Sequence, residues 1–453
     1  MAEGLVEVSS NLSFSSRHES VAVPGAVPGA VESCRLTAYA NQCLCFLSPC
    51  CASGTRAVPV ALTGVGVCGL FAVILRPTTR NRPTSPHRVC DLPMSPKWRV
   101  IDAGSLPFPI PSASRKEIID RLAKEYKTIE DIPEGSLGSV SSMPLHEQIF
   151  VMLVYLACLG IPLAMVPVTM FLAMFVQSKI PLIAYLSTLF IMAAYPMKQD
   201  DREGWIPSRL LHLLYKYSSY KVIYPVTQMP TKPCIGSGGP HGVFPIGSLL
   251  SIPAINDFLG VNFRGGMASV VAKTPALRSL TSCGCTDVSK KNIVREITKN
   301  GATVGIVSDG INGIFAGALD GKNVETLAIE DKKGIAKLAL EQGIDVNIVH
   351  WLGNSDVLVP LVDPFGIMKG LSRKLKMSVF LFTGRFLLPI PTRAPILMAF
   401  GVPVVVPRKI EKPTQAQIDE LHGRICEAHK RAFDAVKRAY GHGYGDKDLL
   451  VCK

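Results

Sequence analysis

The feature that most constrains the fold is an apolar stretch from residue 149 to residue 196, in which Lys179 is the single charged residue. A helix that is apolar on every face is either buried deep in a core or in contact with lipid, and one membrane pass takes about 20 residues. The stretch therefore predicts a transmembrane hairpin over residues 148–196, with a pair of core helices as the alternative. Gly160, Pro162 and Pro167 are expected to kink its first helix.

The part of the chain before this stretch has a different composition. Residues 1–110 are expected to be a disordered or targeting leader, because the first 56 residues are rich in small residues and show no periodicity. Residues 57–75 carry no charge and precede several arginines, so they fit either a membrane segment or part of the targeting sequence. Residues 111–147 are expected to be a linker with a short helix at about 114–127.

The part of the chain after this stretch alternates between predicted helices and predicted strands. The sequence predicts helices over residues 289–300, 331–343 and 413–441, and buried strands over 302–310 and 344–351. Helix–strand alternation of this kind is typical of an α/β domain with a largely parallel sheet. We therefore expect an α/β domain over residues 197–453, directly after the membrane hairpin.

Composition excludes several classes of function. The chain has a net charge of +13, but only 18% of its residues are charged and 48% are hydrophobic. A basic and apolar chain fits a membrane surface or an anionic ligand better than a nucleic acid. None of the 13 cysteines has the spacing of a zinc site, so we expect no metal and no cofactor. The sequence also lacks the GxSxG motif of a serine hydrolase.

One loop has the composition expected of a functional site. The stretch GSGGPHGVFPIG, residues 236–247, places His241 among five glycines and two prolines. Glycine lets a chain turn sharply and lets substrate approach the backbone, while Pro240 fixes one dihedral angle beside the histidine. Taken alone, the loop fits a structural histidine in a turn as well as a catalytic base.

Several stretches, in order, resemble the type-two diacylglycerol acyltransferase family, which includes the monoacylglycerol and wax-ester acyltransferases. They follow the apolar hairpin and are YKVIYPV (220–226), GPHGVFPIG (239–247), GATVGIVSDG (301–310), DKKGIAKLALEQGIDVNIVHWLGNSDVL (331–358) and LHGRICEAHKRAF (421–433). The resemblance covers about residues 149–445 and leaves the leader without a counterpart.

The resemblance implies a membrane-bound enzyme, an acyl-CoA:diacylglycerol O-acyltransferase that makes triacylglycerol. Its partners would be acyl-CoA, diacylglycerol and membrane lipid, and no nucleic acid is expected to bind. Both a monomer and a homo-oligomer stay open. It implies the endoplasmic reticulum membrane with the catalytic domain facing the cytosol, and the leader leaves a plastid membrane as the alternative. Two other functions stay open: transfer to monoacylglycerol or a fatty alcohol, and lipid binding without catalysis.

The resemblance also implies that His241 is the general base. A histidine suits this role because its ordinary pKa of about 6.5 lies near neutral pH. If a helix begins directly after Gly242, its positive end keeps the imidazole neutral, and the N–H groups of the loop, which Gly239 and Pro240 also shape, can hold the oxyanion.

Two positions depart from the family pattern. The family usually reads His-Pro-His-Gly, whereas this chain has Gly239 at the first histidine, and Gly313 stands where the family places a glutamate. Asp309, at the end of a predicted strand, is our candidate partner for His241, with a turn-capping aspartate as the alternative.

Acyl-CoA carries phosphates, which need cations. Lys332 and Lys333 precede a predicted helix start, where N–H groups favour anions, and Arg264 lies beside two glycines. These three are the predicted phosphate ligands, with solvated surface positions as the alternative. Arg385 and the basic run 372–376 are weaker candidates, and His350 is expected to be a buried histidine with satisfied hydrogen bonds.

Overall fold

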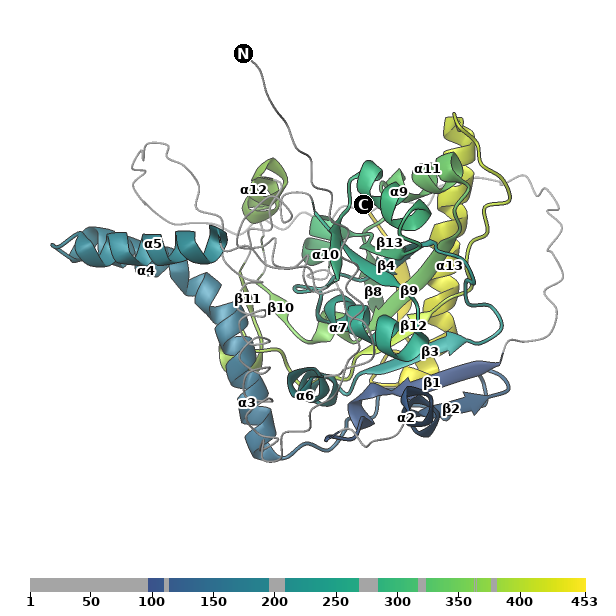
Figure 1. Ribbon diagram of the computed structural model, residues 1–453, viewed down its shortest axis with the longest axis horizontal. Coiled ribbons are helices and arrows are strands. Elements are labelled where there is room, and N and C mark those ends of the chain that lie inside the picture. Colours follow the sequence, from purple (N-terminus) through teal and green to yellow (C-terminus); the bar gives the residue numbers. More distant parts are fainter. Residues whose placement is uncertain are drawn as a thin grey trace, which may run out of the picture.

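The computed structural model describes residues 97–109, 114–194, 208–268, 284–316, 323–361, 363, 365–375 and 381–453 (Figure 1). The predicted leader spans residues 1–110. Its first 96 residues, which include the candidate segment 57–75, lie outside the described residues.

The centre of the domain is a mixed, mostly parallel sheet. Its nine described strands follow the order β2-β1-β3-β12-β9-β4-β7-β5-β6. The pairs β3/β12, β9/β4, β4/β7, β7/β5 and β5/β6 are parallel, so the predicted α/β fold with a largely parallel sheet is confirmed. The strands are β1 (Trp98–Asp102), β2 (Ala123–Tyr126), β3 (Lys221–Pro225), β4 (Ile235–Gly239), β5 (Phe263–Met267), β6 (Cys285–Asp287), β7 (Thr303–Val307), β9 (Val346–Leu352) and β12 (Leu397–Phe400).

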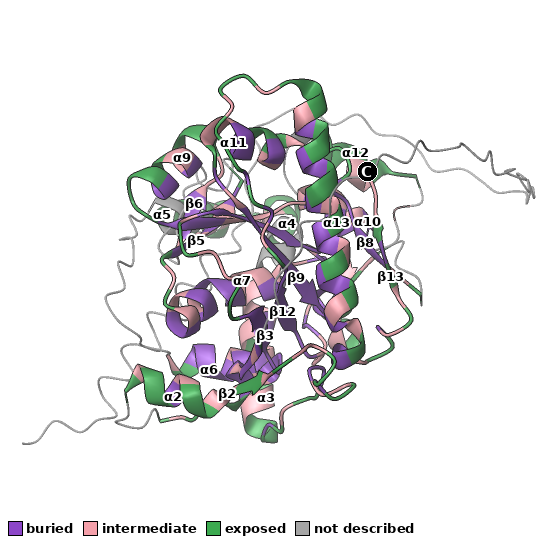
Figure 2. Ribbon diagram, turned by 90° about the vertical axis from the view of Figure 1, so that its right-hand side faces the viewer, coloured by how far each residue is buried: buried purple, intermediate pink, exposed green. Residues whose placement is uncertain are grey.

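Helices cover both faces of this sheet, and the buried residues lie between the layers (Figure 2). One face carries α9 (Lys290–Thr298), α11 (Gly334–Gln342) and the long α13 (Gln415–Tyr440). The other face carries α2 (Arg115–Leu122), α3 (Leu145–Tyr155), α6 (Arg209–Tyr217) and α7 (Ile246–Ala254). The amphipathic pattern predicted for the last helix is confirmed, because Ile418, Leu421, Ile425, Ala432 and Val436 are all buried.

The other sequence-based elements lie close to their predicted places. The described helices α9 and α11 and the strands β7 and β9 fall within or next to the predicted ranges. Gly343 ends α11 in the left-handed conformation, at a φ of 65°, as a glycine at a helix end allows. Ser289 precedes α9, but its side chain makes no capping hydrogen bond.

The predicted boundaries near the N-terminus are wrong. Residues 98–102, assigned to the leader, form β1, which pairs with both β2 and β3. Trp98, Val100 and Ile101 are buried there, so the burial of one short apolar segment outweighs the proline- and arginine-rich sequence before it. The predicted helix at 114–127 ends at Leu122, and residues 123–126 form β2 instead.

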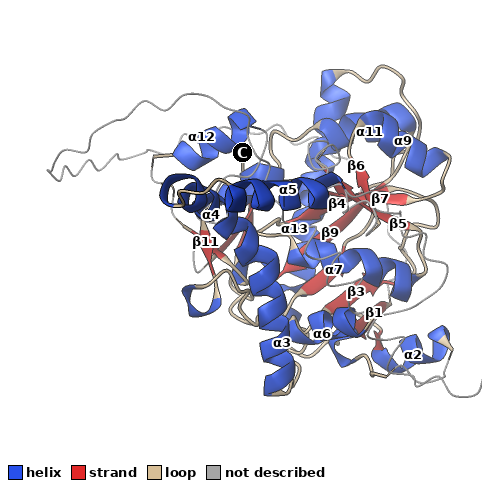
Figure 3. Cartoon of the chain, turned by 60° about the vertical axis from the view of Figure 1, so that its left-hand side comes forward, coloured by secondary structure: helices blue, strands red, loops and turns tan. Residues whose placement is uncertain are grey.

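The apolar stretch forms a helical arm. The helix α3 continues through a π-helical turn, η2 (Leu156–Gly160), into α4 (Ile161–Phe175), and α5 (Ile180–Ala194) runs back beside α4 (Figure 3). The predicted kink and turn are therefore present in this arm. Where the chain is described, no helix has both the length and the apolar character that crossing a membrane requires.

The remaining elements are short. Two small sheets pair β8 (Val324–Leu327) with β13 (Asp448–Val451) and β10 (Val359–Pro360) with β11 (Phe382–Thr383). The short helices are α10 (Gly310–Ala316) and α12 (Ile367–Leu375), and the helical turns are η1 (Ala103–Ser105), η3 (Ile255–Leu259), η6 (Asn354–Asp356) and η7 (Arg385–Leu387).

Candidate active site

The His241 loop lies at the carboxyl end of a central strand. β4 is flanked by two parallel strands, β9 and β7, and it ends at Gly239. Residues 240–245 then cross to α7 on one face of the sheet. In α/β folds, ligands bind at this edge, outside the carboxyl ends of the strands. The fold thus places the predicted loop where a site is expected.

The ring of His241 is held by its own loop. Its Nδ1 lies 2.9 Å from the carbonyl oxygen of Gly242. A carbonyl can only accept a hydrogen bond, so Nδ1 carries the proton and Nε2 keeps the free lone pair. The side chain is partly exposed. Nε2 is therefore the ring nitrogen of His241 that can accept a proton from a bound substrate.

Asp309 lies against this loop, but it does not contact the imidazole ring. The backbone N–H of His241 donates to Oδ2 of Asp309 over 2.8 Å. The carboxyl is fully buried. Burial raises the pKa of Asp309, whereas the nearby His241 ring and the backbone N–H bonds oppose that rise. Asp309 thus lies beside His241, but its hydrogen bond holds the backbone of the loop, whereas the carbonyl of Gly242 accepts from the ring.

The two departures from the family pattern each lie against a buried side chain. A Cβ at Gly239 would overlap the side chain of Leu327 and lie 4.0 Å from Cγ of Asp309. A Cβ at Gly313, one helical turn after Asp309, would overlap the Asp309 carboxylate itself. Glycine at residue 239 therefore leaves room for Leu327, and glycine at residue 313 leaves room for Asp309.

A residue that the sequence did not reveal holds the other side of the loop. The Nδ2 group of Asn354 donates to the carbonyl oxygens of His241 over 2.7 Å and of Pro240 over 3.3 Å, and its Oδ1 accepts from Gly247 N–H over 2.9 Å. Asn354 is 1% exposed. It lies in the stretch HWLGNS, residues 350–355, but nothing local in the sequence shows that it joins the loop to the start of α7.

Gly242 explains why the loop can pass so close to Asn354. Its φ is 62°, in the left-handed region that favours glycine. A Cβ there would lie 2.8 Å from Nδ2 of Asn354. Any larger residue at this position would therefore strain the backbone and push the side chain of Asn354 away from the loop.

The helix-dipole prediction needs a correction. α7 begins at Ile246 rather than directly after Gly242, so the loop separates His241 from the helix start. The effect of a helix end falls off within about one turn. Gly247 N–H, the second of the helix, is also already bonded to Asn354. Within the described residues, no hydrogen bond is found for the N–H groups of Gly242 and Val243.

The predicted phosphate ligands lie away from the loop. Lys333 forms an ion pair with Asp419 of α13 at 2.7 Å, and Lys332 is exposed beside it. Arg264 pairs in register with Val304, which pairs with Ile235, four residues before the end of β4. At about 3.3 Å per residue, that is roughly 13 Å from the edge that carries His241. The structure therefore does not bring these three side chains to the loop.

The weaker candidates have structural roles. Arg373, in the run 372–376, donates to Oδ1 of Asn312 at 3.1 Å and so connects α12 to α10, and Arg385 stacks on Phe386. His350 is fully buried as predicted, but neither ring nitrogen has a hydrogen-bond partner among the described residues. Burial lowers its pKa to about 3, so the ring stays neutral.

The loop with His241 thus lies at the carboxyl edge of a largely parallel α/β sheet, which is where enzymes of this fold class bind their ligands. The chain belongs to the diacylglycerol acyltransferase family, whose family model, "Diacylglycerol acyltransferase", matches residues 171–451. The resemblance seen in the sequence is thereby confirmed.

Curated relatives agree with this assignment. The chain is 26% identical to diacylglycerol O-acyltransferase 2 of Homo sapiens over 267 residues, which cover 54% of this chain and 68% of that protein. It is 25% identical to the Xenopus tropicalis protein of the same name over 339 residues, 69% and 91% of the two chains. It is also 26% identical to 2-acylglycerol O-acyltransferase 1 of Bos taurus, over 57% and 81%. No solved structure matches the chain.

Proposed function

We propose that this diacylglycerol acyltransferase transfers a fatty acyl group from acyl-CoA to the free hydroxyl of diacylglycerol, with His241 as the general base. The observation that carries this role is the orientation of the ring. The bond from Nδ1 to Gly242 leaves Nε2 free at the exposed edge of the loop.

The reaction needs one proton relay. Nε2 of His241 takes the proton of the acceptor hydroxyl as its oxygen attacks the thioester carbonyl. The N–H groups of Gly242 and Val243 stabilise the oxyanion that forms on the carbonyl oxygen. When the carbon–sulfur bond breaks, the imidazolium returns its proton to the CoA thiolate, which leaves as the thiol. The histidine is neutral again at the end of the cycle.

We also propose that the α4–α5 arm binds the membrane that contains the acceptor. Large apolar side chains are exposed along it, including Phe171, Met174, Phe175, Ile180 and Phe190, each at least half exposed. Exposed apolar surface of this extent marks an interaction site, and an acceptor such as diacylglycerol resides in a bilayer. We place the protein at the endoplasmic reticulum membrane with its catalytic domain on the cytosolic side; a plastid membrane is the alternative.

Expression in cells that make no triacylglycerol tests the activity. We expect triacylglycerol to appear with the native chain and to be absent with His241→Ala, although the variant accumulates to the same level. The same lipid extract separates the alternatives, because a product from monoacylglycerol or a fatty alcohol would identify another acceptor. Normal triacylglycerol from His241→Ala would show that His241 is not the base.

A further inference from the structure

An exposed apolar lobe follows the segment that holds the His241 loop. Asn354 belongs to η6, and β10 begins three residues after η6 ends. The apolar lobe consists of β10, α12, β11 and η7, over the described residues 359–361, 363, 365–375 and 381–388. Its apolar side chains that are at least 43% exposed include Phe365, Ile367, Leu371, Leu381, Phe386 and Leu387. An exposed apolar surface of this extent marks an interaction site.

The tip of the apolar lobe is a strained turn. Phe386 and Leu387 have positive φ angles of 61° and 59°, and the N–H of Leu388 donates to the carbonyl oxygen of Arg385 across them. A turn with positive φ at both central residues favours asparagine and glycine, because a bulky side chain clashes in that conformation. Phe386 and Leu387 are nevertheless 67% and 86% exposed. Strain of this kind concentrates at functional sites, and here it presents two bulky apolar side chains to the outside.

Basic side chains accompany the apolar ones. The described residues of the apolar lobe include one acidic residue, Asp363, and four basic residues, Lys369, Arg373, Lys374 and Arg385. On α12, Ile367, Leu371 and Lys374 have the spacing of one helix face, and all three are exposed. The guanidinium of Arg385 lies 4.9 Å from the centre of the Phe386 ring. Apolar side chains combined with net positive charge suit the surface of an anionic bilayer.

The apolar lobe and the helical arm lie on the same side of the molecule. In both Figure 1 and Figure 3, α12 and the β10–β11 pair lie next to α4 and α5. One flat bilayer can therefore contact the lobe and the arm together. Because the lobe follows η6, such a contact brings the edge of the sheet that carries His241 close to the lipid.

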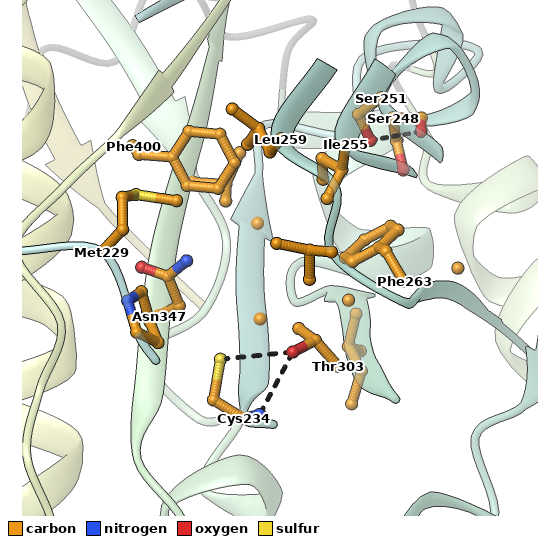
Figure 4. A pocket seen from close by; sticks show the side chains of 18 of the residues that line it. Met229, Cys234, Ser248, Ser251, Ile255, Leu259, Phe263, Thr303, Asn347 and Phe400 are labelled. Carbon is orange, nitrogen blue, oxygen red and sulfur yellow. Dashed lines mark hydrogen bonds between the residues drawn. The ribbon is translucent and has the colours of Figure 1, made fainter. Parts of the chain in front are cut away.

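The cavity under α7 is too small to hold a lipid. Its lining includes Ile255, Leu259 and Phe400 (Figure 4), and its volume is about 40 Å³. A volume of that size has room for water but not for an acyl chain. The apolar side chains of the lobe, by contrast, lie on the surface, where a lipid can reach them.

We propose that the apolar lobe docks on a bilayer that contains anionic phospholipid. The turn at residues 385–388 enters the acyl layer, and the basic side chains of α12 contact the headgroups. The inference rests on the proposed function in one respect, because the acceptor resides in the bilayer to which the lobe brings the His241 edge. The lobe also adds a headgroup preference, since the arm has one charged residue, Lys179, between α4 and α5.

The headgroup preference is tested with two lysines of α12. Purified full-length protein is co-sedimented with phosphatidylcholine vesicles, with and without phosphatidylserine. The native protein should bind the anionic vesicles more tightly, and Lys369→Gln with Lys374→Gln should lose about tenfold of affinity for them alone. The matched control is Lys291→Gln with Lys299→Gln, at two exposed lysines in and beside α9, which lies away from the arm (Figure 3). An equal loss in the control would overturn the proposal, because net charge alone would then explain the binding.

The turn is tested by giving it the residues that its backbone favours. Phe386→Asn with Leu387→Gly removes two apolar side chains and relieves the strain. We expect binding to both kinds of vesicle to fall about tenfold, while the urea midpoint of unfolding stays the same or rises. Unchanged vesicle binding would overturn the proposal. If the native protein dimerises and this variant is monomeric but still binds vesicles, the lobe is an interface with a second copy instead.

A pair of acceptors keeps this inference separate from the activity. Transfer is measured to dioleoylglycerol in anionic vesicles and to dihexanoylglycerol, which dissolves in water. The turn variant should lose at least fivefold of the rate with the first acceptor and keep the rate with the second, whereas His241→Ala should lose both. Native protein that binds vesicles through the lobe but transfers no acyl group would refute the proposed function alone. Equal rates of the turn variant and the native protein with both acceptors would refute the docking role of the lobe.

Discussion

At the scale of single residues, the site depends on backbone contacts to one loop. Asp309 accepts the N–H of His241, and Asn354 donates to the carbonyl oxygens of Pro240 and His241. These two side chains hold opposite sides of the same short segment, while the carbonyl of Gly242 accepts the hydrogen bond from the ring of His241. The position of Nε2 therefore depends on groups that never contact the ring.

The role of Asp309 predicts a difference between two substitutions. Asp309→Asn keeps an acceptor oxygen for the His241 N–H, so we expect turnover within about tenfold of the native rate. Asp309→Ala removes the acceptor and leaves a buried N–H unpaired, so we expect a loss of about 100-fold. Steady-state kinetics at matched protein levels measure both. Equal losses would mean that the charge of Asp309, rather than its hydrogen bond, supports the reaction.

The hydrogen bonds from Asn354 to the His241 loop predict an effect of its substitution on turnover rather than on substrate binding. Asn354→Ala should lower kcat by about 10- to 100-fold and change KM for acyl-CoA by less than about threefold, because it misplaces the base without touching the substrate. Asn256→Ala is the matched control, since Asn256 makes the same pattern of three backbone hydrogen bonds at the other end of α7. A similar loss of kcat in the control would mean that both residues only maintain the fold.

At the scale of elements, the arm predicts a membrane-binding defect. Phe171 and Phe175 lie one turn apart on α4, in contact with each other and more than half exposed. The double substitution to glutamate should reduce co-sedimentation with phosphatidylcholine vesicles severalfold, because charged groups cannot enter the apolar layer. Leu450→Glu is the control, since Leu450 is also more than half exposed but lies on β13. Unchanged vesicle binding of the double variant would exclude the arm as the contact.

Elements with local signals were predictable from the sequence, whereas their long-range contacts were not. The helix at residues 415–440 and the strand at 346–352 follow from apolar periodicity, and the loop at 236–247 from its glycines. Asn354 contacts His241 across 113 positions in sequence, and Gly236, Gly305 and Gly265 meet only in the register of the sheet. Periodicity carries no information on such pairings. The same limit explains the prediction of Lys333 as a phosphate ligand. The sequence showed that Lys333 lies near a helix start, but it could not show that the fold pairs it with Asp419.

At the scale of the whole molecule, two buried histidines make stability depend on pH. His350 and His429 are fully buried, and burial lowers the pKa of each to about 3. The ordinary pKa is about 6.5, so below that pH the unfolded chain binds protons that the folded chain excludes. The stability is complete above pH 6.5 and falls as the pH drops from 6.5 towards 3, by up to about 1.4 kcal/mol per pH unit for each histidine.

Urea titrations in detergent at several pH values check this dependence. We expect the free energy of unfolding to fall steadily below pH 6.5, and His350→Leu to remove about half of that slope. The comparison is of slopes, so a constant loss of stability from the altered packing beside Phe433 does not affect it. A variant whose slope equals the native slope would show that His350 titrates normally in the folded chain.

The crowding around Asp309 has a consequence for how sequences of this family can change. A histidine at residue 239 would meet the side chain of Leu327, and a larger residue at 313 would meet the carboxylate of Asp309. Either replacement therefore requires the neighbouring side chain to move, so grafting the family pattern onto this chain calls for paired changes, residue 239 with residue 327 and residue 313 with residue 309.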